Sequence, residues 1–327
     1  MTIDPFTPLL GQPQAIELLT QAVKQHRVSP AYLFVGIDGV GKTLAARCFV
    51  ELLFSAQTRN IDSLQSRLRQ GNHPDLWWVQ PTYQHEGKRL TVAEAAEKKL
   101  KRKAPPVIRL EQIREITEFL GRPPLEAPRN VVVLESAQTM AESAANALLK
   151  TLEEPGQATL ILIAPSPESV LPTLVSRCQR IPFYRLDTQS LTQVLTQTGH
   201  EEILQHQPVL SIAAGSPGSA IASYEQLQTI PETLLQDVTK VPSSYRHALE
   251  LGKKIAQDLD TEAQLWLVDY LQQSYWQKWH QAEIIHKLEQ ARKSLLCYAQ
   301  PRLVWECTFI ALVRSSSGGT SAPFLGV

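Results

Sequence analysis

An eight-residue glycine-rich segment, GIDGVGKT, carries the clearest chemical signal in this sequence. It fits the phosphate-loop pattern GxxxxGK[ST]. Glycines at 36, 39 and 41 let the backbone bend so that its N–H groups face one anion, Lys42 can reach terminal phosphates, and the Thr43 hydroxyl can bind Mg²⁺. The alternative is a strand-to-helix turn with an incidental lysine. We predict a site for ATP and Mg²⁺ built from Gly36, Gly39, Gly41, Lys42 and Thr43.

Three residues bear on whether such a site can hydrolyse its nucleotide. Asp38 lies inside the loop, where a carboxylate repels phosphate unless it points to solvent. Glu135 directly follows the run VVVL and can hold Mg²⁺, although a lone acid there can also be a solvated loop residue. Ser136 stands where a second, water-activating acid is expected. Because general-base help contributes ~10²–10⁴ in rate, we expect slow hydrolysis or none.

Short apolar runs and helical patterns alternate through the first half of the chain and surround these residues. The runs have the length of buried parallel strands, and the segments between them have helical spacing. Strands that alternate with helices predict an α/β domain with a parallel sheet covered on both faces. The predicted strands are Ala31–Val35, Leu76–Val79, Val131–Leu134 and Leu160–Ala164, and the clearest helices are 14–24, 42–54, 110–120 and 141–154.

The strand signal disappears after about residue 185, and residues 81–107 form a polar and then basic insertion with a poor pattern. The remainder is expected to be helical up to SSSGG at Ser315, where a flexible tail is predicted to start. This change of pattern predicts an α/β domain followed by helical domains.

The composition excludes several classes of protein. The chain has 327 residues, 43% of them hydrophobic, with 32 basic and 32 acidic residues. A zero net charge argues against a wholly basic nucleic-acid coat. The basic run at Lys98, Lys99, Lys101, Arg102 and Lys103 can contact phosphates, but a solvated charged face is the preferred interpretation because no aromatic residues interrupt it.

Targeting and cysteine patterns point to a cytoplasmic protein without a metal centre. No apolar run approaches the ~18 residues of a membrane helix, and the first residues do not form a secretory signal. The cysteines at 48, 178, 297 and 307 contain no CxxC pair, so neither a zinc site nor a disulfide framework is indicated. We therefore expect no membrane association.

Several segments together resemble the clamp-loader branch of the AAA+ ATPases that serve bacterial DNA polymerase III. The resemblance covers almost the whole chain and rests on AANALLKTLEEP (144–155), SRC (176–178), LLGQPQAIELL (9–19), IRLEQIREI (108–116), GSPG (215–218) and LCYAQPRLVWE (296–306). It implies an AAA+ P-loop domain at 1–185, a small helical lid at 186–225 and an all-helical collar domain at 226–315. Residues 316–327 are expected to form the tail.

The resemblance also implies a role in trans for Arg177. In the family, the arginine of SRC reaches the nucleotide held by a neighbouring subunit. There a guanidinium stabilises the charge on the transferring phosphoryl group and accelerates hydrolysis by ~10³–10⁵. The alternative for Arg177 is a surface ion pair. The implied partners are the gamma/tau and delta subunits, and through the complex the sliding clamp and primed DNA.

Several departures from the sequences of the motor subunits favour a subunit that completes a neighbour's active site rather than an ATPase motor. Many relatives carry a four-cysteine zinc module after the P-loop helix, but residues 51–76 contain no cysteine, so we expect no zinc. Ser136 replaces an acid, and Gly218 stands where motors tend to carry arginine. We expect a clamp-loader subunit with a weak ATPase of its own. The alternatives are an autonomous gamma/tau-type ATPase and, less favoured by the charge balance, a direct DNA-binding module.

Overall fold

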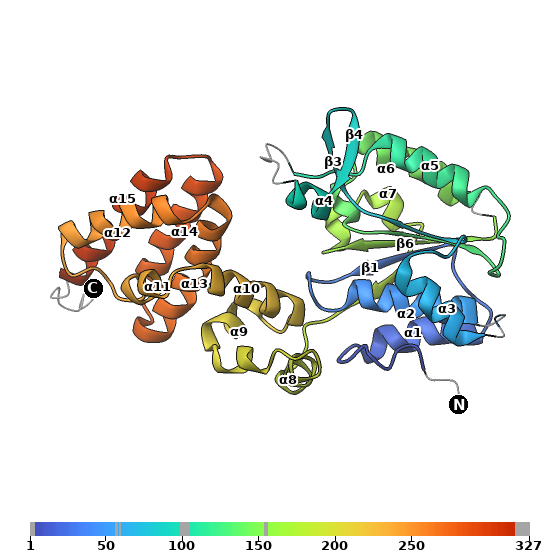
Figure 1. Cartoon of the computed structure of the whole chain (residues 1–327), viewed down its shortest axis with the longest axis horizontal. Coiled ribbons are helices and arrows are strands. Elements are labelled where there is room, and N and C mark those ends of the chain that lie inside the picture. Colours follow the sequence, from blue (N-terminus) through green and yellow to red (C-terminus); the bar gives the residue numbers. More distant parts are fainter. Residues whose placement is uncertain (1–3, 56–57, 59, 99–104, 154–155, 318–327) are drawn as a thin grey trace, which may run out of the picture. The chain divides into compact units, whose positions relative to one another are not determined.

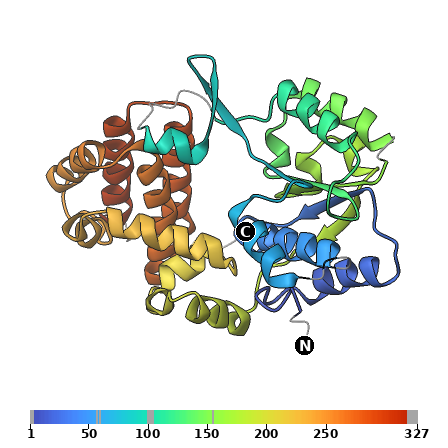
Figure 2. The same ribbon diagram turned by 45° about the vertical axis from the view of Figure 1, so that its right-hand side comes forward.

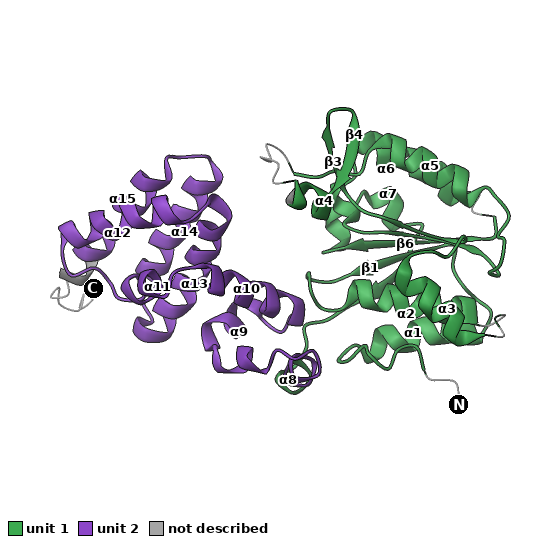
Figure 3. Ribbon diagram, viewed as in Figure 1, with its two compact units in different colours: residues 1–191 green, residues 192–327 purple. Residues whose placement is uncertain are grey.

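The computed structural model describes residues 4–55, 58, 60–98, 105–153 and 156–317 (Figure 1). The chain divides into two compact units, residues 1–191 and 192–327 (Figure 3). The predicted division at 185, 225 and 315 is finer than this, and its inner boundaries stay predictions. The basic run from Lys99 to Lys103 and tail residues 318–327 lie outside the described residues.

Unit 1 is built on a five-stranded parallel sheet in the order β2-β5-β6-β1-β7. Strands β5 and β6 are entirely buried, which explains their largely apolar sequences. All four predicted strands are present. The strands are β1 (Ala31–Val35), β2 (Leu76–Val79), β5 (Asn130–Leu134), β6 (Ala158–Ala164) and β7 (Gln179–Pro182).

Helices cover both faces of this sheet, as the alternating pattern predicted. Helices α1, α2 and α3 lie on one face and α5, α6 and α7 on the other (Figure 1). The helices of unit 1 are α1 (Pro13–Lys24), α2 (Lys42–Ser55), α3 (Ile61–Gln70), α4 (Val92–Glu97), α5 (Leu110–Leu120), α6 (Glu142–Glu153) and α7 (Pro172–Val175), with 3₁₀ turns at Ala137–Thr139 and Pro167–Ser169.

Several elements in unit 1 were not predicted from the sequence pattern, among them the helices α3 and α7. The insertion at 81–107 contains a two-stranded antiparallel hairpin, β3 (Thr82–His85) and β4 (Lys88–Thr91), followed by α4. Figure 2 shows the hairpin projecting from the sheet domain. Strand β7 was also missed, because it is a four-residue edge strand with exposed Gln179 and Arg180.

Unit 2 is helical in the part that the structure describes, as expected. Helix α8 (Thr188–Gln197) runs across the division between the units. Helix α15 continues through Ser317, two residues into the predicted tail. The remaining elements are a 3₁₀ turn at Glu201–Gln205 and the helices α9 (Gln207–Ala213), α10 (Pro217–Thr229), α11 (Glu232–Val238), α12 (Tyr245–Asp258), α13 (Thr261–Trp279), α14 (Ala282–Leu296) and α15 (Pro301–Ser317).

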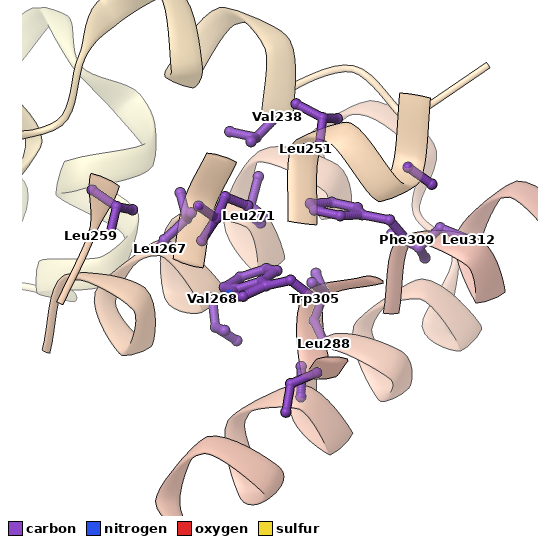
Figure 4. Close-up of a cluster of buried hydrophobic side chains, with 14 of the residues drawn as sticks. Val238, Leu251, Leu259, Leu267, Val268, Leu271, Leu288, Trp305, Phe309 and Leu312 are labelled. Atoms are coloured by element: carbon purple, nitrogen blue, oxygen red, sulfur yellow. The ribbon is translucent and has the colours of Figure 1, made fainter. Parts of the chain in front are cut away.

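A separate hydrophobic core holds α11 to α15 together. Figure 4 shows Trp305 and Phe309 among aliphatic side chains from neighbouring helices. The indole N–H of Trp305 donates to Gln264 Oε1 at 3.0 Å, which satisfies the one polar atom of that buried ring. Trp276, in contrast, is 44% exposed. The aromatic residues of this region therefore divide between core packing and surface.

Candidate nucleotide-binding site

The glycine-rich loop follows the carboxyl end of β1 and leads directly into α2. Two of its glycines are required by geometry. A Cβ atom at Gly36 would lie 2.4 Å from the carbonyl oxygen of Phe183, just beyond β7. Gly41 has φ of +101°, which side-chain-bearing residues rarely adopt. The start of α2 at Lys42 gives the loop the N-terminal end of a fourteen-residue helix, the arrangement that binds phosphate.

Lys42 is only 5% exposed and is held by its own loop. Its ammonium donates to the carbonyl oxygens of Gly36 and Ile37, the latter at 2.8 Å, and to Asp38 Oδ1 at 3.2 Å. Burial lowers the pKa of Lys42, and the carboxylate of Asp38 partly opposes that change. The carboxylate expected to disturb phosphate binding thus contacts the lysine that would bind phosphate.

Glu135 stands at the carboxyl end of β5 and is paired with a residue that the sequence did not single out. Its carboxylate accepts from Gln80 Nε2 at 2.8 Å, and Gln80 directly follows β2. Because β2 and β5 are parallel neighbours, their carboxyl ends meet at one edge of the sheet. Ser136 adopts the left-handed conformation, with φ of +52°. A polar residue directly after the LWWV strand was the available signal for Gln80.

One cleft of about 440 Å³ brings most of the predicted site residues together. Gly36 is the one predicted loop residue that does not line the cleft. The Thr43 hydroxyl and the Glu135 carboxylate in this cleft fit Mg²⁺, which uses one or two carboxylates together with substrate phosphates and water. The lining includes Gly39, Gly41, Lys42, Thr43 and Glu135, together with Asp38, Leu44, Arg47, Ser136 and Ile163.

Arg47 is a further cation on the wall of this cleft. It lies one turn beyond Thr43 on α2, and its guanidinium carbon is 4.7 Å from the ring centre of Trp78. Trp77, the preceding residue on β2, points to the other face and packs against Phe119. The alternation expected for a strand therefore places one tryptophan in the core and the other beneath Arg47.

Arg177 lies far from this cleft, near the opposite edge of the sheet. Strand β7 is parallel to β1, and Gln179 pairs with Tyr32. From this level, Arg177 lies two residues toward the amino end of the strands, whereas Gly36 lies four residues, or ~13 Å, toward the carboxyl end. Arg177 and the phosphate loop therefore lie at opposite ends of these two strands. The side chain of Arg177 is 40% exposed and pairs with Glu153 Oε1 at 3.0 Å. The guanidinium is therefore accessible at the surface and remote from the chain's own phosphate loop.

The thiol of Cys178, beside Arg177, is expected to react more slowly than the exposed cysteines. Burial raises the pKa of the Cys178 thiol to about 12, and burial raises that of Cys48 to about 12 as well. Cys297 and Cys307 are exposed. Because the thiolate is the reactive form, we expect iodoacetamide at pH 8 to label Cys297 and Cys307 first.

Peptide mass mapping of the native chain over time measures this order of labelling. Denatured protein, in which all four thiols are exposed, is the control. Labelling of Cys178 as fast as Cys307 would contradict the partial burial of the Cys178 thiol.

Within the part of the chain that the structure describes, no cluster of three or more His, Cys, Asp or Glu side chains is arranged to hold a metal ion. The helices of the described ranges include none with the length and apolarity needed to cross a bilayer.

Family comparisons match both parts of the chain. Residues 11–187, just over half of it, match the family described as DNA polymerase III, delta subunit. Residues 189–312 match the cyanobacterial DNA polymerase III delta prime, C-terminal domain.

Comparisons with individual proteins agree. The chain is 32% identical over 191 residues to DNA polymerase III subunit delta′ of Bacillus subtilis, covering 57% of this chain and 51% of that protein. It is 31% identical over 200 residues to the subunit delta′ of Pseudomonas aeruginosa, covering 58% and 54%. The chain thus spans about half the length of these curated relatives.

A solved structure shares the fold. The crystal structure of a gamma subunit-related protein of DNA polymerase III from Thermotoga maritima aligns with a TM-score of 0.52 and 18% identity. The alignment covers 90% of this chain and 98% of that one. At this identity the likeness establishes a shared fold and not a shared activity.

Proposed function

The chain belongs to the DNA polymerase III delta subunit family, and from this premise we propose that it is a delta-prime-type subunit of the clamp loader. The observation that carries the proposal is the match of consecutive segments to the delta subunit family and to the delta prime C-terminal domain. In this role it assembles with gamma/tau and delta subunits and helps to load the sliding clamp on primed DNA. The proposal places it in the cytoplasm with the polymerase.

Within the complex, Arg177 acts as the arginine finger for a neighbouring ATPase site. Its exposure and its distance from the chain's own loop support this role, because a finger must reach a nucleotide held by another chain. The nearby Glu153 holds the guanidinium at the surface until the neighbour's phosphates replace it. A surface ion pair of this kind contributes little to folding, so it can be exchanged for a stronger partner.

The chain's own cleft binds ATP with Mg²⁺ and hydrolyses it at a rate close to background. Lys42 and the loop amides bind the phosphates, and Thr43 and Glu135 hold the ion. When bound, Mg²⁺ neutralises charge on the phosphates. The serine at 136 offers no carboxylate to activate water, which separates this site from that of a motor. The proposal includes no zinc.

Reconstitution with candidate gamma/tau and delta subunits tests the assembly. We expect the full-length chain to co-elute with them in size-exclusion chromatography. We also expect clamp loading on primed DNA to require its presence. Failure to join a complex that forms from the other subunits, with loading unchanged in its absence, would overturn the proposal.

The intact phosphate loop keeps one second candidate open, an autonomous gamma/tau-type ATPase. Removing the Lys42 ammonium should abolish hydrolysis by such a motor, because this group contacts the terminal phosphates. For the proposed subunit we expect the purified chain to hydrolyse ATP at a background rate that is the same in Lys42→Ala. A coupled ATPase assay of the two proteins measures this. Robust turnover that Lys42→Ala abolishes would instead establish the motor.

A further inference from the structure

The ammonium of Lys42 has all three of its donor positions occupied by its own loop. Its acceptors are the carbonyl oxygens of Gly36 and Ile37 and the Asp38 carboxylate. An ammonium group has three N–H donors, so these contacts satisfy it completely. A nucleotide phosphate can bind this lysine only by displacing one of them. The carboxylate is the acceptor that sits on a side chain and can therefore be removed by substitution.

The ion pair between Asp38 and Lys42 contributes little to folding. The side chain of Asp38 is 82% exposed, although the ammonium that it contacts is almost fully buried. An ion pair with one partner so exposed is screened by water and contributes little to stability. The consequence of this carboxylate is therefore expected mainly at the cleft, where Asp38 and Lys42 both line the wall.

We propose that Asp38 is an affinity- and specificity-determining residue: its carboxylate competes with the terminal phosphate for Lys42 and disfavours nucleoside triphosphates relative to diphosphates. The proposal rests on the nucleotide-binding part of the proposed function. A phosphate-loop lysine contacts the β- and γ-phosphates. The γ-phosphate adds negative charge at the point where Asp38 already neutralises the lysine. A diphosphate lacks that group and meets less repulsion.

This competition gives the chain a phosphate loop with the usual residues and a reduced preference for triphosphate. A subunit that retains a diphosphate, or stays empty, would not change state with each round of hydrolysis in the complex. Asp38 thus acts on ligand choice, whereas Ser136 concerns the hydrolytic step.

Isothermal titration calorimetry of the full-length chain with MgATP and with MgADP tests the proposal. We expect Asp38→Asn to tighten the binding of MgATP by about fivefold and that of MgADP by about twofold or less, the size expected for an ion pair with one exposed partner. Asp38→Glu keeps the carboxylate and should retain the weak, diphosphate-preferring behaviour. Glu86→Gln, at the exposed turn of the β3–β4 hairpin, removes the same charge elsewhere and should match the wild type.

The outcomes separate this inference from the function on which it rests. Equal affinities in the wild type and Asp38→Asn, or equal tightening for the two nucleotides, would overturn the role of Asp38 and leave the nucleotide site intact. If neither nucleotide binds any variant, the loop is not a nucleotide site and both statements fall. Membership of the clamp loader is read independently from co-elution, which Asp38→Asn should not change.

Discussion

Replacing Arg177 with alanine should reduce ATP hydrolysis at the neighbouring site of the reconstituted clamp loader by ~10³-fold or more. The physical reason is the loss of a guanidinium that stabilises charge on the transferring phosphoryl group. Other sites of the complex would keep their own arginines, so steady-state hydrolysis should fall by less than the rate at the affected site. Single-turnover hydrolysis with clamp and primed DNA present measures the affected site directly.

Arg180→Ala provides a matched control for this experiment. Arg180 is an exposed arginine on β7, three residues further along the chain. The substitution Arg180→Ala removes the same charge and the same side-chain volume from the same part of unit 1. Hydrolysis should be unchanged in Arg180→Ala and only partly restored in Arg177→Lys, because an ammonium lacks the planar fork of the guanidinium.

Two results would contradict the finger role. One is unchanged single-turnover hydrolysis in the Arg177→Ala complex, and the other is an equal loss in both alanine variants. A folding defect is not expected to obscure the result. Arg177 contributes an exposed ion pair with Glu153, and such pairs are worth about 0–1 kcal/mol. The melting temperature of the isolated chain checks this directly.

The placement of Arg177 illustrates how far the sequence could lead. The phosphate loop is a local feature, and its pattern specified both the preceding strand and the following helix. Arg177 was assigned a role in trans through a resemblance of motifs, but its distance from Gly36 depends on the direction and pairing of β7. That strand has only four residues, two of them polar and exposed, so its sequence carried no strand signal.

Contacts between residues distant in sequence could not be predicted either, because they depend on how the strands pair. Asp38 was recognised as unusual because it lies inside the motif, and its partner Lys42 is four residues away. The bond from Gln80 to Glu135 joins two strand ends that are 55 residues apart. No periodicity encodes such a pair, because it follows from the order of strands in the sheet. The same applies to Asp75, whose partners are about fifty residues away.

Asp75 is the residue whose replacement should most destabilise unit 1. Its side chain is 1% exposed, and its carboxylate accepts hydrogen bonds from three successive backbone N–H groups, those of residues 125, 126 and 127, at 2.7, 2.8 and 2.7 Å. These bonds fix the loop between α5 and β5. Asparagine can supply only one acceptor oxygen and turns an N–H₂ group toward the remaining donors. We expect Asp75→Asn to lower the free energy of unfolding by about 3 kcal/mol.

The difference between Asp75→Asn and the wild type should depend on pH in a defined direction. Burial alone would raise the pKa of Asp75, but the three N–H donors outweigh it and lower the pKa below its ordinary value. A carboxyl with a lowered pKa in the folded state stabilises the fold above its unfolded pKa, and this contribution is lost as the pH falls through the folded value. The difference should therefore be constant from pH 7 to about pH 5 and shrink below about pH 4.

Urea denaturation of the full-length chain measures this prediction, with alkylation of Cys48 and Cys178 as a probe specific to unit 1. Asp62→Asn, at an exposed site on α3, is the matched control, and its effect should stay below about 1 kcal/mol because it concerns only the first turn of a helix. A destabilisation of Asp75→Asn that grows as the pH falls would contradict the argument. Such a result would mean that the carboxyl group stabilises the loop in its protonated form, as a donor, which three N–H partners cannot accept.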